Sequence, residues 1–571
     1  MAAAISPPPS YINPPDLHPP LGYSHVSTVG VATKSGTVAG QVGQDSSGQT
    51  SPAYDTQVAQ AFANQRSCLA AAGTSPTNVT KLTYYVVDYD PSKLSAVGDG
   101  LQATFALDRF PPCTLVPVPA LASPEFLFEI DATAVAPDES TAGTVSDVVV
   151  IGAGLSGLEA ARKIQAAGLS CLVLEAMDRV GGKTLSVPSV PGRATIDDVR
   201  AAWINDTSQS EMYKLFQRYR LERDFQRTSG NTLHQDRDRT VAAAPYGNSP
   251  LSEEGAGAVA KLLPAWSRLI EEHNLEHPAM SPQAERLDGM SFARYREDES
   301  KLPAVVEVAN QITRALLSVE ADEISALFLT DYIKSATGFT NIVSDKKDGG
   351  QYIRCKTGMQ SICHYMAKEL KPGSLQLHTP VATIQQTERG CVVRSSIGAV
   401  FRSKKVIVSV PTTLYPTMTF SPPLPAKKQA LAENSILGYY SKMVLVWDKP
   451  WWRDQGFSGI LQSRAGPASF TRDTSIEAAQ QWSISCFIVG NPGRRWSQLS
   501  QMMRKKSIWD QFRAAFEHAG ARVPEPINFI GLSSKTSLVW KRYMEGAIRS
   551  GQRGADEVVA SLLSTSVAAE G

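Results

Sequence analysis

Hydrophobic positions along the first 137 residues predict a small α+β domain behind a Pro-rich, irregular arm at 1–20. The predicted order is strand, strand, helix, strand, helix, strand, strand. A turn at Lys34-Ser35-Gly36 is expected to separate the first two strands. The first helix is expected over 54–72, because four apolar residues fall on one helical stripe: Tyr54, Val58, Phe62 and Leu69.

A polar, small-residue linker at 138–146 separates this domain from a longer region with a different pattern of predicted strands and helices. The segment DVVVIGAGLSG predicts a strand, a tight turn and a helix, and CLVLEA predicts the next strand. Residues 250–345 are mostly helical in pattern, and 375–420 return to strands. SKMVLVWD predicts a further strand. MEGAIRSGQRGADEVVASLL predicts a closing helix whose small residues indicate a close approach to another element.

Composition limits the partners. The chain has 56 Lys plus Arg against 55 Asp plus Glu, so neither a nucleic acid nor an anionic membrane is expected as a partner. Seven scattered cysteines without a CxxC pair indicate a reducing compartment and no metal site. No secretory signal, membrane-spanning run or peroxisomal C-terminal signal is seen, so a cytoplasmic location is expected.

The strongest motif is G-x-G-x-x-G, formed by Gly152, Gly154 and Gly157 between a strand and a helix. The first glycine permits the tight turn, the second admits a pyrophosphate, and the third allows helix and strand to pack closely. Glu175 ends the next strand, where a carboxylate can accept hydrogen bonds from ribose hydroxyls. The motif predicts dinucleotide binding. The alternative is a Gly-rich turn in an ordinary βαβ unit.

A second run of glycines and cations favours FAD over NAD. Arg179, Gly181, Gly182 and Lys183 follow Glu175 closely. In two-dinucleotide-domain flavoproteins such a stretch runs beside the FAD pyrophosphate, where the glycines permit close backbone approach and a cation pairs with phosphate. The alternative is a simple surface turn.

These residues resemble the flavin-containing amine oxidases, the family of monoamine and polyamine oxidases. The resemblance covers about 147–563 and is closest to the fungal aminopolyol amine oxidases, which deaminate fumonisin-type toxins. The segments that carry it are VVVIGAGLSGLEAARKIQAAG, LVLEAMDRVGGKT, KTGMQSI, TPVATI, VIVSVPTTLYPTMTFSPPLP, ILGYYSKMVLVWDKPWW and SLVWKRYMEGAIRSGQRGA.

The resemblance implies roles for individual residues. The ADP half of FAD would be held by Gly152, Leu155, Ser156, Glu175, Ala176 and Lys183, with Lys183 standing where the family usually has arginine. Val381 would contact FAD through its backbone, Trp203 lies in the stretch passing the isoalloxazine ring, and Met544 would open the last helix. Two residues match catalytic positions: Lys442, which would hold a water near flavin N5, and Tyr543, which would form one wall of the amine-guiding cage. Trp452 is a candidate pocket wall.

Two of these residues have plainer interpretations. Lys442 shares a strand face with Val444 and Val446, and a lysine there is often an edge-strand residue that snorkels to solvent. Tyr543 alone would more often be a core or helix-start aromatic.

The chemistry that the resemblance implies is oxidative deamination of a primary amine. A hydride equivalent passes from the carbon bearing the amine to non-covalently bound FAD, the imine hydrolyses to a carbonyl and ammonia, and O2 reoxidises the flavin to give hydrogen peroxide.

Three departures from the family pattern bear on activity. Arg200, in DVRAAW, stands where the family has glycine near the flavin. About forty residues are missing before the last helix. Lys535 stands where the family has the glutamate of a Gly-Thr-Glu motif.

The N-terminal domain resembles the Rid (reactive intermediate deaminase) family through Gly22-Tyr23-Ser24-His25, AGQVGQD and FLFEIDATA. Cys113 replaces that family's catalytic arginine, so no imine-deaminase activity is expected. Oligomerisation is the better expectation, and a homo-oligomer through this domain is predicted; a covalently attached packing partner is the alternative.

The expected architecture is a Rid-like α+β domain followed by a two-domain flavoprotein, with a Rossmann-type FAD-binding domain and a mixed α+β substrate domain. The expected boundaries are an arm (1–20), the Rid-like domain (21–137), a linker (138–146), FAD-binding parts (147–225, 350–415 and a shortened 525–563) and substrate parts (226–349 and 416–524). Competing hypotheses are an inactive, truncated relative, a Rid-type oligomeric binding module and, least favoured, a nicotinamide-dependent dehydrogenase.

Overall fold

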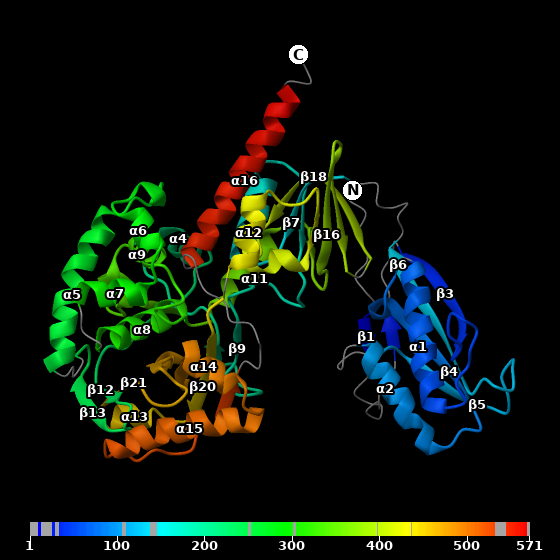
Figure 1. Cartoon of the computed structure of the whole chain (residues 1–571), viewed down its shortest axis with the longest axis horizontal. Coiled ribbons are helices and arrows are strands. Elements are labelled where there is room, and N and C mark those ends of the chain that lie inside the picture. Colours follow the sequence, from blue (N-terminus) through cyan, green and yellow to red (C-terminus); the bar gives the residue numbers. More distant parts are fainter. Residues whose placement is uncertain are drawn as a thin grey trace.

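The computed structural model describes residues 10–12, 26–28, 33–72, 74–105, 110–137, 145–248, 253–300, 304–396, 398–435, 437–531 and 544–567. Within them the N-terminal domain and two further lobes each have their own sheet (Figure 1). Tyr543 and Lys535, the Rid-like residues 22–25 and most of the linker lie outside the described residues.

The N-terminal domain is a four-stranded sheet against which α1 (Tyr54–Ala71) packs, with α2 (Leu94–Thr104) beside it. The sheet order is β3 (Thr33–Val42), β6 (Phe128–Pro137), β4 (Val79–Val87), β5 (Cys113–Val118). Its apolar core includes Phe62, Tyr84 and Phe128, and the Phe128 ring stacks on both of the others. The expected turn at Lys34-Ser35-Gly36 is wrong: β3 runs straight through it, because those residues pair with Val135 and its neighbours on β6. The arm was expected to be irregular, but its residues Ser10–Ile12 form a strand, β1, that pairs with β2 (Val26–Thr28) of the following domain.

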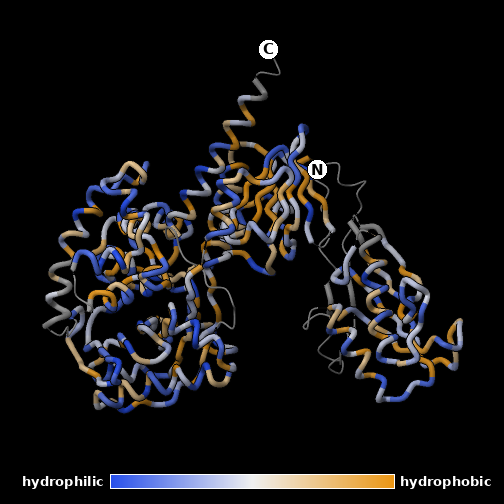
Figure 2. Tube along the Cα trace, in the orientation of Figure 1, coloured by the Kyte–Doolittle hydropathy of each residue, from blue (hydrophilic) through white to orange (hydrophobic). Residues whose placement is uncertain are grey.

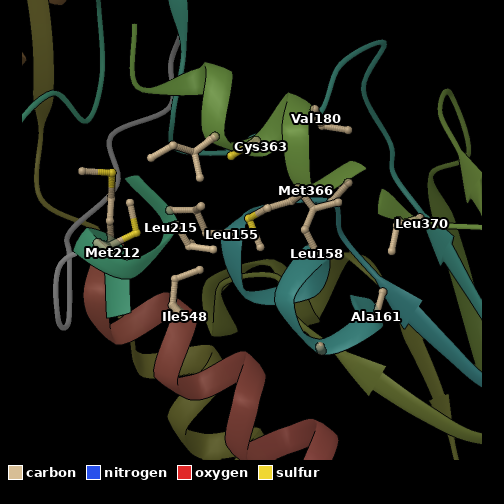
Figure 3. Close-up of a cluster of buried hydrophobic side chains, with 14 of the residues drawn as sticks. Leu155, Leu158, Ala161, Val180, Met212, Leu215, Cys363, Met366, Leu370 and Ile548 are labelled. Atoms are coloured by element: carbon tan, nitrogen blue, oxygen red, sulfur yellow. The ribbon is translucent and has the colours of Figure 1, made fainter. Parts of the chain in front are cut away.

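The first lobe is built on a seven-stranded sheet and holds the dinucleotide motif. The strand order is β15 (Leu375–Gln376), β8 (Cys171–Leu174), β7 (Ser146–Ile151), β18 (Val400–Val408), β17 (Gly390–Ser395), β16 (Val381–Thr387), β19 (Thr419–Ser421). The first four strands are parallel, as a Rossmann-type unit requires. Their apolar runs appear in Figure 2. Helices α3 (Leu155–Ala166), α11 (Gln360–Glu369) and α16 (Met544–Val567) pack together over this sheet (Figure 3).

The second lobe also has a seven-stranded sheet. Its order is β13 (Val241–Pro245), β12 (Asn231–Gln235), β21 (Phe457–Ser463), β22 (Phe470–Asp473), β23 (Trp482–Val489), β20 (Tyr440–Trp447), β24 (Asn528–Gly531). Strand β24 belongs to this sheet, whereas α16 packs on α3 in the first lobe. The stretch 525–563, expected as one piece of the FAD-binding domain, therefore contributes to both lobes.

The remaining helices and short ladders surround the two sheets. The helices are α4 (Ser210–Arg218), α5 (Glu253–Glu272), α6 (Ala284–Asp288), α7 (Phe292–Ser300), α8 (Ala304–Leu317), α9 (Ala326–Ser335), α10 (Phe339–Val343), α12 (Ala426–Asn434), α13 (Trp451–Asp454), α14 (Gly490–Ser497) and α15 (Gln501–His518). The ladders pair β9 (Ser186–Pro188) with β10 (Ile196–Asp198) and β11 (Arg223–Phe225) with β14 (Ile353–Cys355). Helices α5 to α9 share one apolar core, which matches the helical pattern expected over 250–345.

These elements confirm the predicted fold class, a parallel cofactor-binding sheet and a mixed second domain behind a small α+β domain. Across the described residues, no helix is long and apolar enough to span a bilayer.

Candidate dinucleotide and amine site

The turn between β7 and α3 has the geometry of a dinucleotide site. Gly152 adopts a φ of +101°, in the left-handed region that favours glycine. A Cβ on Gly157 would lie 2.0 Å from the Gly152 carbonyl oxygen, so only glycine fits there. A Cβ on Gly154 would meet nothing within 4 Å, so this side of the turn is open at the start of α3. Leu155 and Ser156 form the first turn of that helix.

Glu175 is fixed beside this turn by the backbone. Its Oε2 accepts a hydrogen bond from the Ala153 N–H at 2.6 Å, and its Oε1 accepts one from the Met177 N–H at 2.9 Å. Each oxygen keeps a second lone pair for a ribose hydroxyl. Ala176 lies exposed directly after it.

The second glycine pair packs onto the first motif. The Gly181 N–H donates to the Ala153 carbonyl at 2.8 Å, and a Cβ on Gly182 would lie 3.3 Å from the Gly154 Cα. The sequence had separated these loops by more than twenty residues, and the structure brings them together.

Three cations gather at this junction. The Arg179 guanidinium donates to the carbonyls of Val180, Gly182 and Thr184 and so fixes the loop. Burial, with a further contribution from the nearby charge of Arg200, lowers the pKa of Lys183 to about 8. Burial also lowers the pKa of Arg200, with Arg179 adding to the effect. Arg200 thus lies near enough to Lys183 and Arg179 for the like charges to interact.

Lys442 lies on the second-lobe strand β20 and is completely buried. Its Nζ donates to the Arg200 carbonyl at 2.6 Å and to the Asp198 carbonyl at 3.4 Å. It also lies 4.9 Å from the ring centroids of Trp203 and of Phe487. Burial lowers the pKa of Lys442, and the charge of Asp198 opposes this effect. Because β20 lies between β23 and β24, the edge-strand interpretation of Lys442 is wrong.

An aromatic wall that sequence reasoning missed continues from Trp203. Phe487 lies 6.0 Å from Trp203, 6.0 Å from Tyr440 and 4.3 Å from Phe470, measured between ring centroids. The Trp203 Nε1 donates to Gln226 at 2.9 Å, which orients the indole. Phe487 lies opposite Lys442 on the neighbouring strand, in a register that the segment WSISCFIV alone does not reveal.

The structure settles the position of the other expected residues to different degrees. Met544 is buried in the apolar core at the start of α16, and Val381 is half-buried at the first position of β16. Trp452 is not a pocket wall: it is fully buried in the second-lobe core and donates to Asp473 at 2.9 Å. In the N-terminal domain, burial raises the pKa of the Cys113 thiol, so a neutral group replaces the family's guanidinium.

The residues present fit FAD. An open glycine turn at a helix N-terminus, a fixed carboxylate and clustered cations are what a dinucleotide diphosphate and ribose need. Lys442 and Phe487, from the second lobe, contact the same segment, 198–203.

Comparison with known proteins agrees with this geometry. Residues 155–533 match the family described as Flavin containing amine oxidoreductase, and residues 17–136 match the family described as Endoribonuclease L-PSP, in agreement with the Rid-like prediction.

Individual relatives are amine oxidases. The chain is 25% identical over 464 residues to a probable flavin-containing monoamine oxidase A of Dictyostelium discoideum, covering 74% of this chain and 99% of that protein. It is 32% identical over 337 residues to a putrescine oxidase of Kocuria rosea, covering 56% and 69%. A putrescine oxidase structure bound to putrescine superposes with a TM-score of 0.66 at 23% identity, covering 73% of this chain and 99% of that one. Cyclohexylamine oxidase from Brevibacterium oxydans gives 0.66 at 22% identity, covering 73% and 100%.

Proposed function

Because this chain belongs to the flavin-containing amine oxidoreductase family, whose members use FAD, we propose that it deaminates a primary amine oxidatively, with a long-chain aminopolyol as substrate class. The products are a carbonyl compound, ammonia and hydrogen peroxide. One observation carries the proposal. Segment 198–203 lies beside the dinucleotide turn, and the same segment contacts the group formed by Lys442, Trp203 and Phe487.

The chain's own residues position and desolvate the amine. FAD, when bound, would accept a hydride equivalent from the carbon that bears the amine and pass the two electrons on to O2. Trp203 and Phe487 present apolar faces that exclude water, and Gln226 holds the Trp203 indole in place. Lys442 holds the backbone that passes the ring and supplies a donor from the opposite lobe. Tyr543 is proposed as a wall of the amine cage, by resemblance.

FAD is proposed to be held without a covalent bond. Denaturing the purified protein with acid should then release all yellow colour into the supernatant. Colour that stays with the precipitate would contradict this part of the proposal.

The decisive test is the visible spectrum before and after anaerobic addition of an amine. Bands near ~450 nm that bleach with amine and return with air establish the activity. A panel of a long-chain aminopolyol, putrescine and benzylamine separates the substrate classes. The aminopolyol class is abandoned if putrescine or benzylamine bleaches the flavin at a far lower concentration.

Two alternatives have specific support. Arg200 and the shortened segment near 525–540 favour an inactive relative, which would give bands that no amine bleaches, or a colourless protein that FAD cannot reconstitute. The Rid-type domain with Cys113 favours an oligomeric binding module, which predicts that oligomerisation follows residues 1–137.

A further inference from the structure

The segment KTGMQSI, residues 356–362, carries part of the family resemblance but has no role in the site described so far. In the structure it forms the turn before α11 and the first residues of that helix. Gly358 adopts a φ of +79°, and a Cβ there would lie 2.6 Å from the Ser186 Cβ. Only glycine therefore lets this turn approach the end of the second glycine loop, 180–186.

The side chain of Gln360 joins the two ends of that loop. Its Oε1 accepts a hydrogen bond from the Ser186 N–H at 3.0 Å, and its Nε2 donates to the Val180 carbonyl at 2.9 Å. A backbone N–H can only donate and a carbonyl can only accept, so the amide is used in full in this one orientation. Gln360 is 5% exposed, so both contacts are shielded from water. Between them lie Gly181 and Gly182, both at positive φ.

The start of α11, from which Gln360 extends, is itself held by Asp198. The Asp198 Oδ1 accepts hydrogen bonds from the Met359 N–H at 2.9 Å and from the Ser186 Oγ at 2.5 Å. The same Ser186 Oγ accepts from the Gln360 N–H at 3.1 Å. A carboxylate at a helix N-terminus is favourable, because it meets free N–H groups and the positive end of the helix dipole. The amide of Gln360 therefore extends from a fixed backbone.

The loop that Gln360 closes is the one that packs on the dinucleotide turn. Its Gly181 N–H donates to the Ala153 carbonyl, and Gly182 approaches Gly154. Glycine has more conformational freedom to lose than any other residue, so ordering this loop only when a ligand arrives would weaken binding. A loop that is ordered beforehand avoids that loss at the moment of binding.

We propose that Gln360 is a positioning residue for the dinucleotide, which holds loop 180–186 against the first glycine turn in the conformation that binds. The cofactor affinity of this chain then depends on Gln360 through the loop. The inference rests on FAD as the cofactor of the proposed function and assigns no part of the amine chemistry to Gln360.

The test measures the Kd of FAD and of ADP for the apoprotein by titration calorimetry, with no amine present. Gln360→Met keeps the length of the side chain and removes both contacts, so we expect both Kd values to rise about 10-fold. Gln511→Met is the matched control. Gln511 fastens a loop of the second lobe in the same way, accepting from the Ala468 N–H at 2.9 Å and donating to the Ala465 carbonyl at 2.6 Å. Its replacement should leave both Kd values unchanged, even where it lowers the unfolding temperature.

Gln360→Glu separates this hydrogen bond from a general loss of packing. A neutral carboxylic acid has the shape of the amide and can donate to the Val180 carbonyl, whereas a carboxylate cannot. FAD should bind about 10-fold more weakly than to wild type at pH 7.5. At pH 5.5 the ratio should fall to about 3-fold or less, because burial raises the pKa of the new carboxyl. The titratable groups around this junction, Asp198, Arg179, Lys183 and His364, are common to both proteins, so the ratio at each pH isolates the substitution.

Several results would overturn the proposal. Unchanged FAD affinity in Gln360→Met, or an equal loss in Gln511→Met, means that the loop needs no such support. Weaker FAD with unchanged ADP places the effect outside the diphosphate half. A Gln360→Glu ratio that does not change with pH removes the contact to the Val180 carbonyl from the explanation. A wild-type protein that binds neither ligand also overturns it.

Folding is checked by circular dichroism and thermal unfolding of each variant. If Gln360→Met does not fold, the pH dependence of Gln360→Glu decides the question, because its neutral form keeps both contacts. A protein that binds FAD and ADP as expected but is not reduced by any amine leaves this inference standing and defeats the proposed function.

Discussion

If Lys183 binds the cofactor phosphates, as the family resemblance implies, we expect cofactor binding to be sensitive to alkaline pH. Its pKa in the free protein is lowered to about 8, and a phosphate beside it would raise that value, so the complex favours the charged form. FAD affinity should therefore be full below pH 8 and fall as the pH rises above 8, by about 10-fold for one lost charged contact. The measurement is the Kd of FAD between pH 6.5 and 9.5.

Lys183→Arg is the matched variant, because a guanidinium stays charged throughout this range. Its FAD affinity should be flat with pH. A wild-type profile equally flat up to pH 9.5 would show that Lys183 does not contact the phosphates.

Replacement of Lys442 should affect both stability and chemistry. Lys442→Met leaves two buried carbonyls without their donor and Asp198 without its nearby positive charge. We expect a loss of about 3 kcal/mol in the free energy of unfolding and flavin reduction by amine at least about 10-fold slower. Urea unfolding and anaerobic stopped-flow spectra measure the two effects.

The contrast for Lys442→Met is Lys404→Met, which removes an exposed lysine paired with Asp147. That variant should change neither quantity measurably. Normal reduction rates in Lys442→Met would remove the residue from the proposed catalytic group.

At single positions, the sequence predicted the glycine turn and the place of Glu175 at the end of the next strand, because these depend on local spacing. For Lys442 the sequence alone suggested an edge-strand residue that snorkels to solvent, and only the family resemblance gave it a role in the site. The sequence could not predict that the acceptor for Lys442 is the carbonyl of Arg200, since the two residues lie 242 positions apart and meet only through the two lobes. Phe487 was missed because its contacts depend on the pairing of β23 with β20 and on packing against Trp203 from the other lobe.

Among the elements, α16 makes the closest helix contact to the cofactor motif. A Cβ on Gly551 would lie 2.2 Å from the Ser156 carbonyl oxygen on α3, whereas one on Gly554 would meet nothing within 4 Å. Gly551→Leu should push α16 away from α3, cost about 2–3 kcal/mol of unfolding free energy and weaken FAD binding. Gly554→Leu, on the same helix, should keep both values. Equal effects of the two substitutions would contradict the proposed close packing.

The close approach of α16 was predictable from its small residues. The strand over Lys34–Gly36 was not, because pairing with β6 outweighs the local turn tendency of Gly36. The sequence also could not predict that β24 belongs to the second sheet, because this depends on long-range pairing with β20.

At the scale of the whole molecule, the N-terminal domain has a core of its own, separate from those of the two lobes. A protease site inserted in 138–146 should therefore allow cleavage without loss of FAD or of amine-dependent bleaching. Size-exclusion chromatography of the cleaved parts reports which one carries the oligomer; we expect it to be residues 1–137. Loss of flavin on cleavage would show that the domain completes the site.

The buried polar contacts between the lobes have a consequence for how the protein melts. Asp197 of the first lobe accepts hydrogen bonds from Gln481 and Ser483 of the second, and Lys442 reaches back to the Arg200 carbonyl. Neither lobe can satisfy these groups alone. Separating the lobes would therefore leave buried polar groups without their hydrogen-bond partners. Calorimetry should accordingly record one shared transition for both lobes, with the N-terminal domain as an independent second peak.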